Sequence, residues 1–352
     1  MNIFNVRVER LKKGPPLIGI CISNAKPEFK NIVKRRLQLY PEDATLLIFR
    51  ILDLNFGQLK SRGDCLEKKK GQIEQKQGFF PFPDVIFMQC HADRKIVNRI
   101  EKIIGRKIFN NLLFDKWECW NLLKVYNELC DHLPDSRKLE NEIDMQQFLC
   151  DYEDVLLKPV NGHSGKGIVR VKLQKARNIE AIYLQNGEMI SEEFDSFRDF
   201  WDWFSARLPN QSFIIQQSIQ TVKLAEMATD VRLHMNKNHK GEWQVSTLLF
   251  RVATNDSHIA HTLKWVLGID YLEKMFFEID MERAIVDLGL KICKAFDKSG
   301  YHMADLGIDM GLDENGHPWI FEVNPLPFPH SLQNQYYAFT RPIEYANYLL
   351  SK

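Results

Sequence analysis

Residues 304–327 read ADLGIDMGLDENGHPWIFEVNPLP, and this stretch decides the fold prediction. Two apolar segments flank Asp313-Glu314-Asn315-Gly316, and an Asn-Gly pair between such segments is a strong signal for a β-hairpin. A two-residue turn places Asp309 opposite Glu322, whereas a four-residue turn leaves Asp309 one pair away. Because side chains alternate between faces, both registers put Asp309, Glu322 and Asn324 on one face. The opposite face is predicted to be core and carries Ile308, Met310, Trp319, Phe321 and Val323.

The polar face of this hairpin has the composition of a cation site. Two carboxylates on one sheet face repel each other unless they are solvated or bind a cation. Two carboxylates and an amide oxygen suit magnesium, which also binds phosphate oxygens. The hairpin therefore predicts a magnesium site at Asp309, Glu322 and Asn324, and the alternative is an acidic strand that faces solvent.

A glycine-rich motif lies upstream, where residues 156–171 read LLKPVNGHSGKGIVRV. Its glycines let the backbone adopt positive φ and bring N–H groups close to a ligand, and Lys158 can add an ammonium. It is not a Walker A loop, because only two residues separate Gly162 from Gly165 and a strand follows instead of a helix. The motif predicts a phosphate site, and the alternative is an ordinary glycine-rich hairpin.

The first hundred residues alternate short apolar runs with loops and helical patterns, which predicts an open α/β sheet. Strands are expected at 16–22, 45–51 and 84–88. One helix is expected between an Asp93 cap and Gly105, and another between an Asp115 cap and Pro134. The polar stretch 58–78 carries six basic and three acidic residues. It predicts a solvated loop or a mobile hairpin, with use as a basic binding patch left open.

From about residue 151 the pattern changes to longer strands and hairpins with helices between them. Apolar stripes predict helices around 197–204 and 285–296, both packed on a core. This mixture predicts an α+β arrangement of antiparallel sheets with helices on one side. Strands are expected at 155–160, 168–173, 213–217, 231–236, 244–252, 306–312 and 317–323.

The composition of the 352-residue chain is that of an ordinary globular protein, with 45% apolar and 26% charged residues. Lys and Arg number 47 and Asp and Glu 46, so the net charge is +1. This balance gives no reason to expect nucleic acid or an anionic membrane as a partner, and any anion site must be local. We also expect no membrane span and no signal peptide. Seven scattered cysteines without a Cys-x-x-Cys pair predict a reducing cytoplasm.

In this order and spacing, the motifs resemble the ATP-grasp superfamily, and within it the YheC/YheD group of endospore coat-associated proteins. The resemblance runs from about Lys107 to Pro327 and extends more weakly over the first hundred residues. It implies an ATP-grasp fold, in which two α+β lobes clamp ATP between antiparallel sheets, preceded by a small α/β domain. The implied domains are residues 1–106 and 107–352, with lobes at about 107–216 and 217–352.

The resemblance also implies roles for single residues. IFNNLLFDKW (108–117) resembles the segment with the first ATP-contacting lysine, and the strand of Lys158 resembles the one with the second. FIIQQSI (213–219) resembles the hinge that binds adenine through backbone groups, and the Asp230–Arg232 segment resembles the one that holds ribose and polyphosphate. The implied catalytic residues are Arg251 and Arg232. The implied nucleotide-binding residues are Lys116, Lys158, Gly162, His163, Ser164, Gly165, Lys166, Gly167, Gln216, Gln217, Ile219 and Asp230, with Asp309, Glu322 and Asn324 as magnesium ligands.

The implied activity is that of a carboxylate–amine or carboxylate–thiol ligase, which uses ATP and one or two Mg²⁺ ions and forms an acylphosphate. Its implied substrates are small-molecule or peptide carboxylates and amines. Its implied partners are spore coat proteins, and its implied location is cytoplasmic or spore-associated. Asp305 shares the strand face of Asp309 and either holds an amine substrate or sits beside the metal.

The sequence departs from the family pattern on the acceptor side. Residues 251–274 contain no Gly-Gly segment, and Asn255 is the remnant expected there. Residues 84–90 read DVIFMQC, where relatives usually carry a Tyr-Asp-Arg-like ending. Two other functions therefore remain open, a non-catalytic coat or scaffold protein that retains nucleotide binding and an ATP-dependent kinase. His258 and His261 are interpreted as surface or core residues.

Overall fold

The computed structural model describes residues 15–23, 27–111, 113–162, 166–207, 211–253, 263–327, 329 and 335–352. The chain divides into two compact units. The first consists of Met1–Leu112, Asn238–Gly241 and Phe339–Lys352, and the second consists of Leu113–Lys237 and Glu242–Ala338. Most of the C-terminal helix thus belongs to the first unit, although in sequence it falls within the predicted second lobe, residues 217–352. The division at residue 106 remains a prediction.

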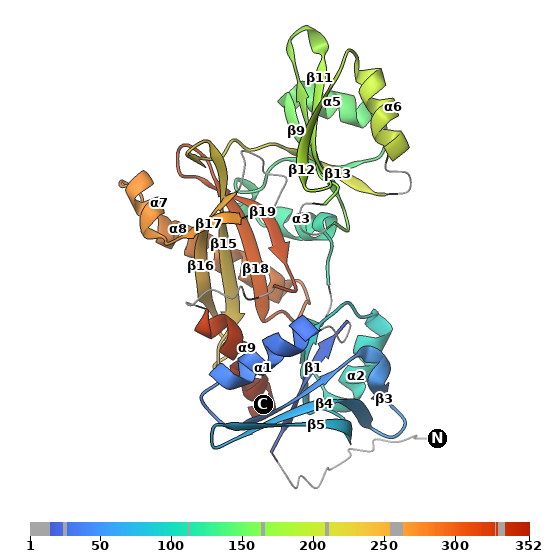
Figure 1. The fold of residues 1–352 in the computed structure, drawn as a ribbon, viewed down its shortest axis with the longest axis vertical. Coiled ribbons are helices and arrows are strands. Elements are labelled where there is room, and N and C mark those ends of the chain that lie inside the picture. Colours follow the sequence, from blue (N-terminus) through green and yellow to red (C-terminus); the bar gives the residue numbers. More distant parts are fainter. Residues whose placement is uncertain are drawn as a thin grey trace. The chain divides into compact units, whose positions relative to one another are not determined.

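The first unit is an α/β layer structure built on a sheet whose central strands are parallel (Figure 1). All six residues of β1 are buried, because helices cover both faces of a parallel sheet. Helix α2 packs on one face. On the other face the ring of Tyr345 in α9 meets Phe109 edge-on at 5.1 Å. The elements are β1 (Leu17–Ile22), α1 (Pro27–Leu39), β2 (Ala44–Phe49), a 3₁₀ turn (Ile51–Asp53), β3 (Leu54–Asn55), β4 (Lys60–Lys69), β5 (Gln72–Pro81), β6 (Val85–Gln89), α2 (Arg94–Ile104), β7 (Ile108–Phe109) and α9 (Tyr336–Ser351).

The local signals in this unit are confirmed. The Asp93 carboxylate accepts a hydrogen bond from the Lys95 amide at 2.6 Å, and Gly105 ends α2 with a φ of 71°. Of the two structures predicted for the polar stretch 58–78, a loop or a hairpin, the chain forms the hairpin, made of β4 and β5. Because β4 also pairs with β2, Cys65 and Leu66 are buried and supply enough apolar contact to hold a largely polar strand in the sheet.

The second unit begins with a six-stranded antiparallel sheet in the order β12-β11-β10-β9-β13-β8. Two helices cover one of its faces, and their Phe148 and Phe200 pack against strand residues such as Leu157 and Ile215. The strands and the helix predicted between 155 and 217 are therefore confirmed. The elements are β8 (Ser136–Leu139), α5 (Glu142–Tyr152), β9 (Asp154–Pro159), β10 (Val169–Leu173), β11 (Ile179–Gln185), β12 (Glu188–Phe194), α6 (Phe197–Arg207) and β13 (Phe213–Gln217).

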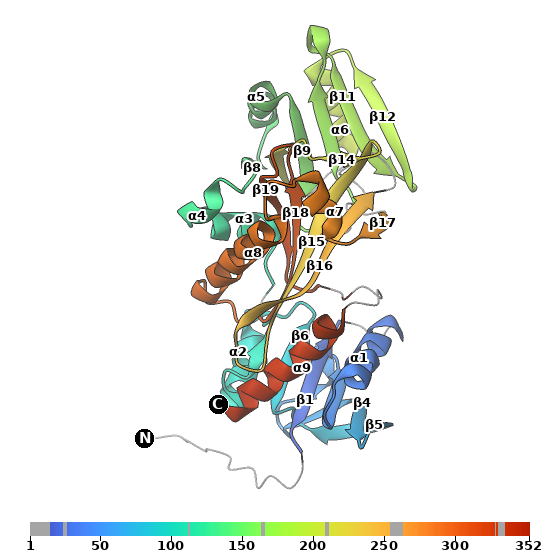
Figure 2. The same cartoon turned by 90° about the vertical axis from the view of Figure 1, so that its left-hand side faces the viewer.

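The second sheet of this unit has the order β17-β16-β15-β18-β19, and β14 pairs with β15 (Figure 2). Val231, Leu233 and Met235 of β15 face the helical core, so the alternate residues Arg232, His234 and Asn236 share the other face. This second face carries the site. The elements are β14 (Lys223–Leu224), β15 (Met227–Lys237), β16 (Trp243–Ala253), β17 (Leu263–Leu267), α7 (Asp270–Met275), α8 (Met281–Lys298), β18 (Asp305–Leu312) and β19 (Pro318–Asn324).

The helix predicted from Asp115 to Pro134 is wrong in its length. The chain forms α3 (Lys116–Lys124) and the short α4 (Asn127–Cys130), and the break falls at Val125 and Tyr126. Leu123 and Leu129 nevertheless lie in one hydrophobic core. The apolar spacing continues across the break, which is why the pattern alone did not show it. Among the described residues, no helix is long and apolar enough to cross a membrane.

Candidate functional site

The hairpin of β18 and β19 places Asp309 opposite Glu322, as one of the two registers predicts. Both predicted turns are wrong, however, because the five residues 313–317 connect Leu312 to its partner Pro318. Near the turn Met310 pairs with Ile320, and a bulge between Asp309 and Met310 then shifts the register. Phe321 is the extra residue of this bulge. The bulge brings Glu322 back opposite Asp309.

The predicted core face of the hairpin is wrong at two positions, Trp319 and Phe321. Ile320 joins the core with Ile308, Met310 and Val323, whereas Trp319 and Phe321 do not. The Trp319 indole donates a hydrogen bond to Asp313 Oδ2 at 3.1 Å. The Phe321 ring lies over Gly311, since a Cβ added to that glycine would stand 2.2 Å from Cζ of the ring. The five-residue turn places Trp319 opposite Gly311, on the face away from the core, and the bulge at Phe321 then returns Val323 to the core face. Alternation along the sequence could not show either effect.

Asp309 accepts hydrogen bonds from three side chains. Arg232 Nη1 lies 2.8 Å from both carboxylate oxygens, Arg251 Nη2 lies 2.7 Å from Oδ1, and Asn324 Nδ2 lies 2.9 Å from Oδ2. Asp309, Arg232 and Arg251 are all buried, with 4%, 8% and 5% of their surfaces exposed. Charges at this depth require partners, because burial of an isolated charge is costly. Arg232 is therefore not a surface ion-pair residue.

Arg251 also forms a fork with Asp230, its cross-strand neighbour on β15. Its Nε and Nη2 donate to the two Asp230 oxygens at 2.5 and 2.6 Å. Burial alone lowers the pKa of the Arg251 guanidinium, but the charges of Asp309 and Asp230 outweigh it and raise that pKa above its usual value. Two guanidinium groups thus balance two carboxylates on one face of the second sheet.

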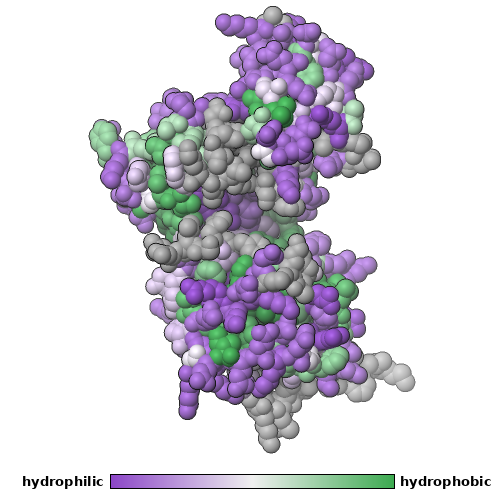
Figure 3. All heavy atoms as spheres, viewed as in Figure 1, coloured by the Kyte–Doolittle hydropathy of each residue, from purple (hydrophilic) through white to green (hydrophobic). Residues whose placement is uncertain are grey.

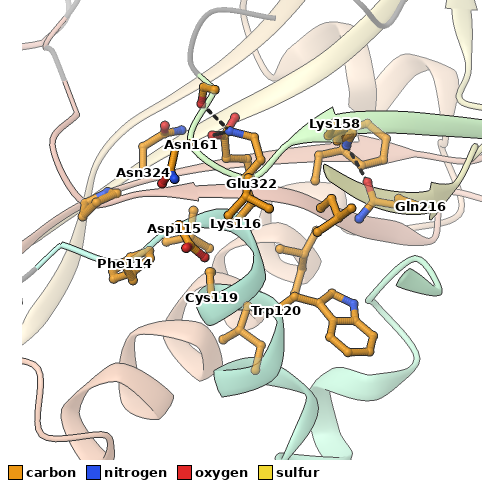
Figure 4. A pocket seen from close by; sticks show the side chains of 18 of the residues that line it. Phe114, Asp115, Lys116, Cys119, Trp120, Lys158, Asn161, Gln216, Glu322 and Asn324 are labelled. Carbon is orange, nitrogen blue, oxygen red and sulfur yellow. Dashed lines mark hydrogen bonds and ion pairs between the residues drawn. The ribbon is translucent and has the colours of Figure 1, made fainter. Parts of the chain in front are cut away.

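Lys116 is the first residue of α3, and its position is fixed by a capping box in which Asp115 and Glu118 cap each other's backbone amides. Its ammonium lies 2.6 Å from the Gly162 carbonyl oxygen and 2.9 Å from Glu322 Oε1. Figure 4 shows Lys116 and Glu322 side by side, with Asn324 nearby. A lysine in the first turn opposes the helix dipole, so these contacts, and not helix stability, explain it.

Lys158 of β9 is buried, and its ammonium donates to Oε1 of Gln216 on β13 (Figure 4). The Gln216 amide in turn donates to Ser136 Oγ at 2.9 Å. Burial lowers the pKa of Lys158 to about 8, although the charge of Glu322 acts in the opposite direction. Within the described part of the chain, Lys158 has no carboxylate within ion-pair distance. Its charge is therefore available to an anion.

A cavity of about 400 Å³ brings several predicted residues together. Trp120, Leu133 and Ile320 give it an apolar wall, and Phe321 also lines it, with the Lys158 ammonium 5.8 Å from the ring centre. The sequence reasoning missed Phe321, and it missed the side-chain role of Gln216, for which only backbone contacts were expected. The predicted residues in its lining are Lys116, Lys158, Gly162, Gln216, Glu322 and Asn324.

The other predicted residues lie around this cavity or outside the described chain. Asp230, Arg232, Arg251 and Asp309 form the adjoining network, which Asn324 joins to the cavity. The backbone amide of Gln217 donates to the Asp135 carbonyl at 2.9 Å, and Ile219 is buried. Lys166 is exposed, and Gly167 has a φ of 77° that favours glycine. Outside the described residues lie His163, Ser164, Gly165, Asn255, His258 and His261.

The residues of the hairpin fit a magnesium ion by the chemistry of their oxygens. Asp309, Glu322 and Asn324 lie in one region of β18 and β19. Both carboxylates form ion pairs, Glu322 with Lys116 and Asp309 with the two arginines described above. Hard carboxylate and amide oxygens are the donors that magnesium takes. Among the described residues, no group of three His, Cys, Asp or Glu side chains could hold a metal. A magnesium site here therefore needs the Asn324 amide oxygen and oxygens from outside the protein.

Asp305 lies farther along β18 and is fully buried. Its Oδ1 accepts from His234 Nε2 at 2.6 Å and from Asn236 Nδ2 at 2.9 Å. Both partners come from the neighbouring strand β15, on the same face as Arg232. The two predicted roles of Asp305, an amine ligand and a neighbour of the metal, remain predictions.

Comparison with known proteins identifies a family and relatives for this chain. Residues 105–349 match the YheC/D-like ATP-grasp family. The chain is 26% identical to the endospore coat-associated protein YheD of Bacillus subtilis (strain 168), over 96% of this chain and 79% of that protein.

Two solved structures show the same fold at low identity. The VanG D-Ala:D-Ser ligase of Enterococcus faecalis superposes with a TM-score of 0.55 at 12% identity, over 96% of this chain and 99% of that one. N5-carboxyaminoimidazole synthetase of Staphylococcus aureus, complexed with ADP, superposes with a TM-score of 0.53 at 10% identity, over 94% of this chain and 77% of that one. The chain thus has the ATP-grasp fold and belongs to the YheC/D-like ATP-grasp family.

Proposed function

We propose that this protein is an ATP-dependent ligase that activates a carboxylate for attack by an amine or a thiol. The observation that carries the proposal is the convergence of Lys116, Lys158, Glu322 and Asn324 on one cavity, beside the buried network of Asp309 with two arginines. Side chains that suit a polyphosphate and a metal ion thus lie together in this chain, which belongs to an ATP-grasp family. The ADP complex of a structural neighbour supports the nucleotide.

In this proposal the two lysines neutralise the phosphates. Lys158 lacks a carboxylate partner in the described chain, and a phosphate would be its anionic partner. Because the Lys158 side chain is buried, that interaction would be strong. Lys116 is held by Glu322 and by the Gly162 carbonyl, so it stands between the glycine-rich loop and the hairpin. Glycines of that loop add backbone donors. Adenine is assigned to the backbone around Gln216, Gln217 and Ile219.

Asp309, Glu322 and Asn324 would hold one or two magnesium ions, with phosphate oxygens completing the ligand set. When bound, magnesium offsets the charge of the phosphates. The side chains themselves bind and orient. Arg232 fixes the direction of the Asp309 carboxylate, and Arg251 adds a guanidinium that is held in place by Asp230.

The proposed reaction has two steps. A substrate carboxylate oxygen attacks the γ-phosphorus, the bond from that phosphorus to the β-phosphate bridging oxygen breaks, and ADP leaves. An amine or thiol then attacks the acyl carbon of the acylphosphate, the bond from that carbon to the phosphate oxygen breaks, and the amide or thioester forms. Inorganic phosphate leaves, and the proton lost by the amine or thiol passes to it or to water. Most of the rate acceleration comes from positioning and from preorganised charge, so the protein needs little acid–base chemistry.

Nucleotide binding is tested by thermal melting and calorimetry with and without Mg-ATP. Mg-ATP is expected to raise the melting temperature, and Glu322→Gln is expected to abolish the magnesium-dependent part of the affinity. Glu314→Gln is the matched control, because Glu314 is exposed in the turn of the same hairpin. Unchanged affinity in Glu322→Gln would show that the hairpin does not hold the metal.

Turnover is tested by ADP release with pooled carboxylates and amines, followed by mass spectrometry of the products. A ligase gives a condensed product and free phosphate. A product that retains the phosphoryl group would identify a kinase instead.

A second candidate is a coat or scaffold protein that keeps the nucleotide site without catalysis. Two observations favour it: the relative YheD is named an endospore coat-associated protein, and residues 251–274 contain no Gly-Gly segment. On this alternative the partners are spore coat proteins and the location is the spore. Stabilisation by Mg-ATP without turnover in the pooled screen would favour it.

A further inference from the structure

A second cavity, of about 220 Å³, lies in the first unit at the carboxyl ends of two parallel strands. Ile22 ends β1 and Phe49 ends β2, and both line the cavity together with Lys30 of α1. Arg50 and Asp53 follow β2 and form another wall. In open α/β sheets, ligands bind at this carboxyl edge. None of the lining residues takes part in the nucleotide site proposed above.

The remaining wall comes from the polar stretch 58–78. The hairpin of β4 and β5 contributes Arg62, Gly63, Asp64 and Gln77 to the cavity. Gly63 permits this placement, because a Cβ on it would lie 2.2 Å from the Ile48 carbonyl oxygen of β2. Hydrophilic residues dominate the part of the surface over β4 and β5 in Figure 3. The unusual composition of this stretch therefore coincides with a polar cavity wall.

The charges in the cavity do not cancel. Lys30 pairs with Asp64 at 2.6 Å, and Arg50 forms a fork with Asp53 at 2.9 and 3.0 Å. Arg62 is a third cation, and its guanidinium makes no hydrogen bond within the described part of the chain. The hydrogen bond from Arg50 is the main cause that holds the pKa of Asp53 below its usual value, and the nearby charge of Arg62 adds to it. Three cations and two carboxylates leave one positive charge facing the cavity.

We propose that this cavity binds a small oxyanion, either a carboxylate or a phosphate group. The Arg62 guanidinium, whose donors match such groups in geometry, supplies the main contact. Lys30 and Arg50 line the same space and are held in place by Asp64 and Asp53. The site lies within the first unit and shares no residue with the nucleotide site, so it stands or falls without the proposed ligase activity.

The test is calorimetric titration of the full chain at low ionic strength with inorganic phosphate and, separately, with malonate. Saturable binding of at least one is expected, and the tighter of the two identifies the group. Arg62→Gln should weaken it about tenfold or more, since it removes a charge-assisted contact. Arg106→Gln is the control and should bind normally. Arg106 is also exposed, but it precedes β7 and so lies toward the amino edge of the parallel strands.

Asp53→Asn tests whether the charge of the cavity wall controls the affinity for an anion. It removes a negative charge from the cavity wall, so the affinity for the anion should rise severalfold. Weaker anion binding in Asp53→Asn would overturn the proposal, and so would equal affinity in wild type and Arg62→Gln. Effects of phosphate and malonate that sodium chloride reproduces at matched ionic strength would also overturn it, because they would reflect screening and no site.

Discussion

At the scale of single residues, Lys158 is a buried cation with no carboxylate in ion-pair distance among the described residues. Replacing it with glutamine removes an ammonium that the proposed function assigns to a phosphate. The expected loss is about 1.5–3 kcal/mol for a charged hydrogen bond, or roughly ten- to hundredfold in Mg-ATP affinity. Calorimetry measures this loss. Lys166→Gln is the control, since Lys166 is exposed on the glycine-rich segment that follows β9, and its effect should be smaller. Equal losses in both variants would contradict the assignment.

The same lysine predicts a pH dependence. Burial lowers its pKa to about 8, so the free protein holds a neutral amine above that pH, while an unfolded lysine stays charged to about 10.4. Between these values the unfolded chain binds more protons, so this group makes stability rise with pH. Nucleotide affinity should depend on pH in the opposite direction, because a phosphate stabilises the protonated form of Lys158. Mg-ATP affinity should therefore fall as the pH rises through 8.

Calorimetry at pH 8.5 in buffers of different ionisation enthalpy can count the protons. Wild type is expected to take up a proton when it binds Mg-ATP, and Lys158→Gln is expected to take up fewer. Identical proton uptake in the two proteins would show that another group titrates.

Gly307 predicts a second effect of a single residue. A Cβ added there would stand 2.5 Å from Arg232 Nη2 and 2.9 Å from Cβ of Pro327, so alanine must displace the arginine from Asp309. Overpacking of this kind costs about 1–3 kcal/mol. Gly307→Ala should therefore melt earlier and lose turnover. Gly78→Ala is the control, because its nearest new contact is 4.0 Å away. Normal turnover in Gly307→Ala would show that the contact between Arg232 and Asp309 is dispensable.

At the scale of elements, the start of α3 links helix stability to the site. Asp115→Ala removes a capping box worth about 1 kcal/mol. Without the cap, the position of the next residue, Lys116, is no longer fixed. Asp93→Ala removes a comparable cap from α2, far from any predicted nucleotide contact in sequence. Both variants should lose stability on thermal melting, but only Asp115→Ala should lose Mg-ATP affinity. If both kept full affinity, the cap would have no part in placing Lys116.

The hairpin of β18 and β19 shows how far the sequence predicts this site. Alternation and the Asn-Gly signal predict Asp309 opposite Glu322, and the structure contains this pair. The agreement depends on the bulge, which offsets the wrong turn length by one residue. The bulge at Phe321 depends on tertiary contacts, with the ring packed over Gly311. No local pattern encodes it, so the five-residue turn and the exclusion of Trp319 and Phe321 from the core were missed.

Buried polar contacts were harder to predict than strands. Lys158 and Gln216 come from neighbouring strands, and Leu157 pairs with Ile215 beside them. Their contact follows from sheet order and not from sequence spacing. The break between α3 and α4 was missed for a related reason, since the apolar side chains on both sides of it reach one core.

At the scale of the whole molecule, charge is distributed in compensated local groups. The network of Asp309 has two arginines and two aspartates, and Lys116 pairs with Glu322. The net charge of +1 therefore coexists with two places where a cation faces a cavity, at Lys158 and at Arg62. A bound anion at either place needs no long-range field around the protein, and at the buried Lys158 it also gains from a low dielectric.

The division into two units predicts where a nucleotide protects the chain. Every residue assigned to ATP lies in the second unit, within Leu113–Lys237 and Glu242–Ala338. A ligand that binds the folded state stabilises it by about 2.7 kcal/mol at a hundredfold excess over Kd. Hydrogen exchange with Mg-ATP should therefore slow in β9, β13, β18 and β19. The strands β1, β2 and β6 of the first unit should exchange at the same rate with and without Mg-ATP. Phosphate or malonate should slow exchange in the first unit and leave the second unit unchanged. Protection by Mg-ATP confined to the first unit would place the nucleotide outside the lysine-lined cavity and overturn the assignment of Lys116 and Lys158.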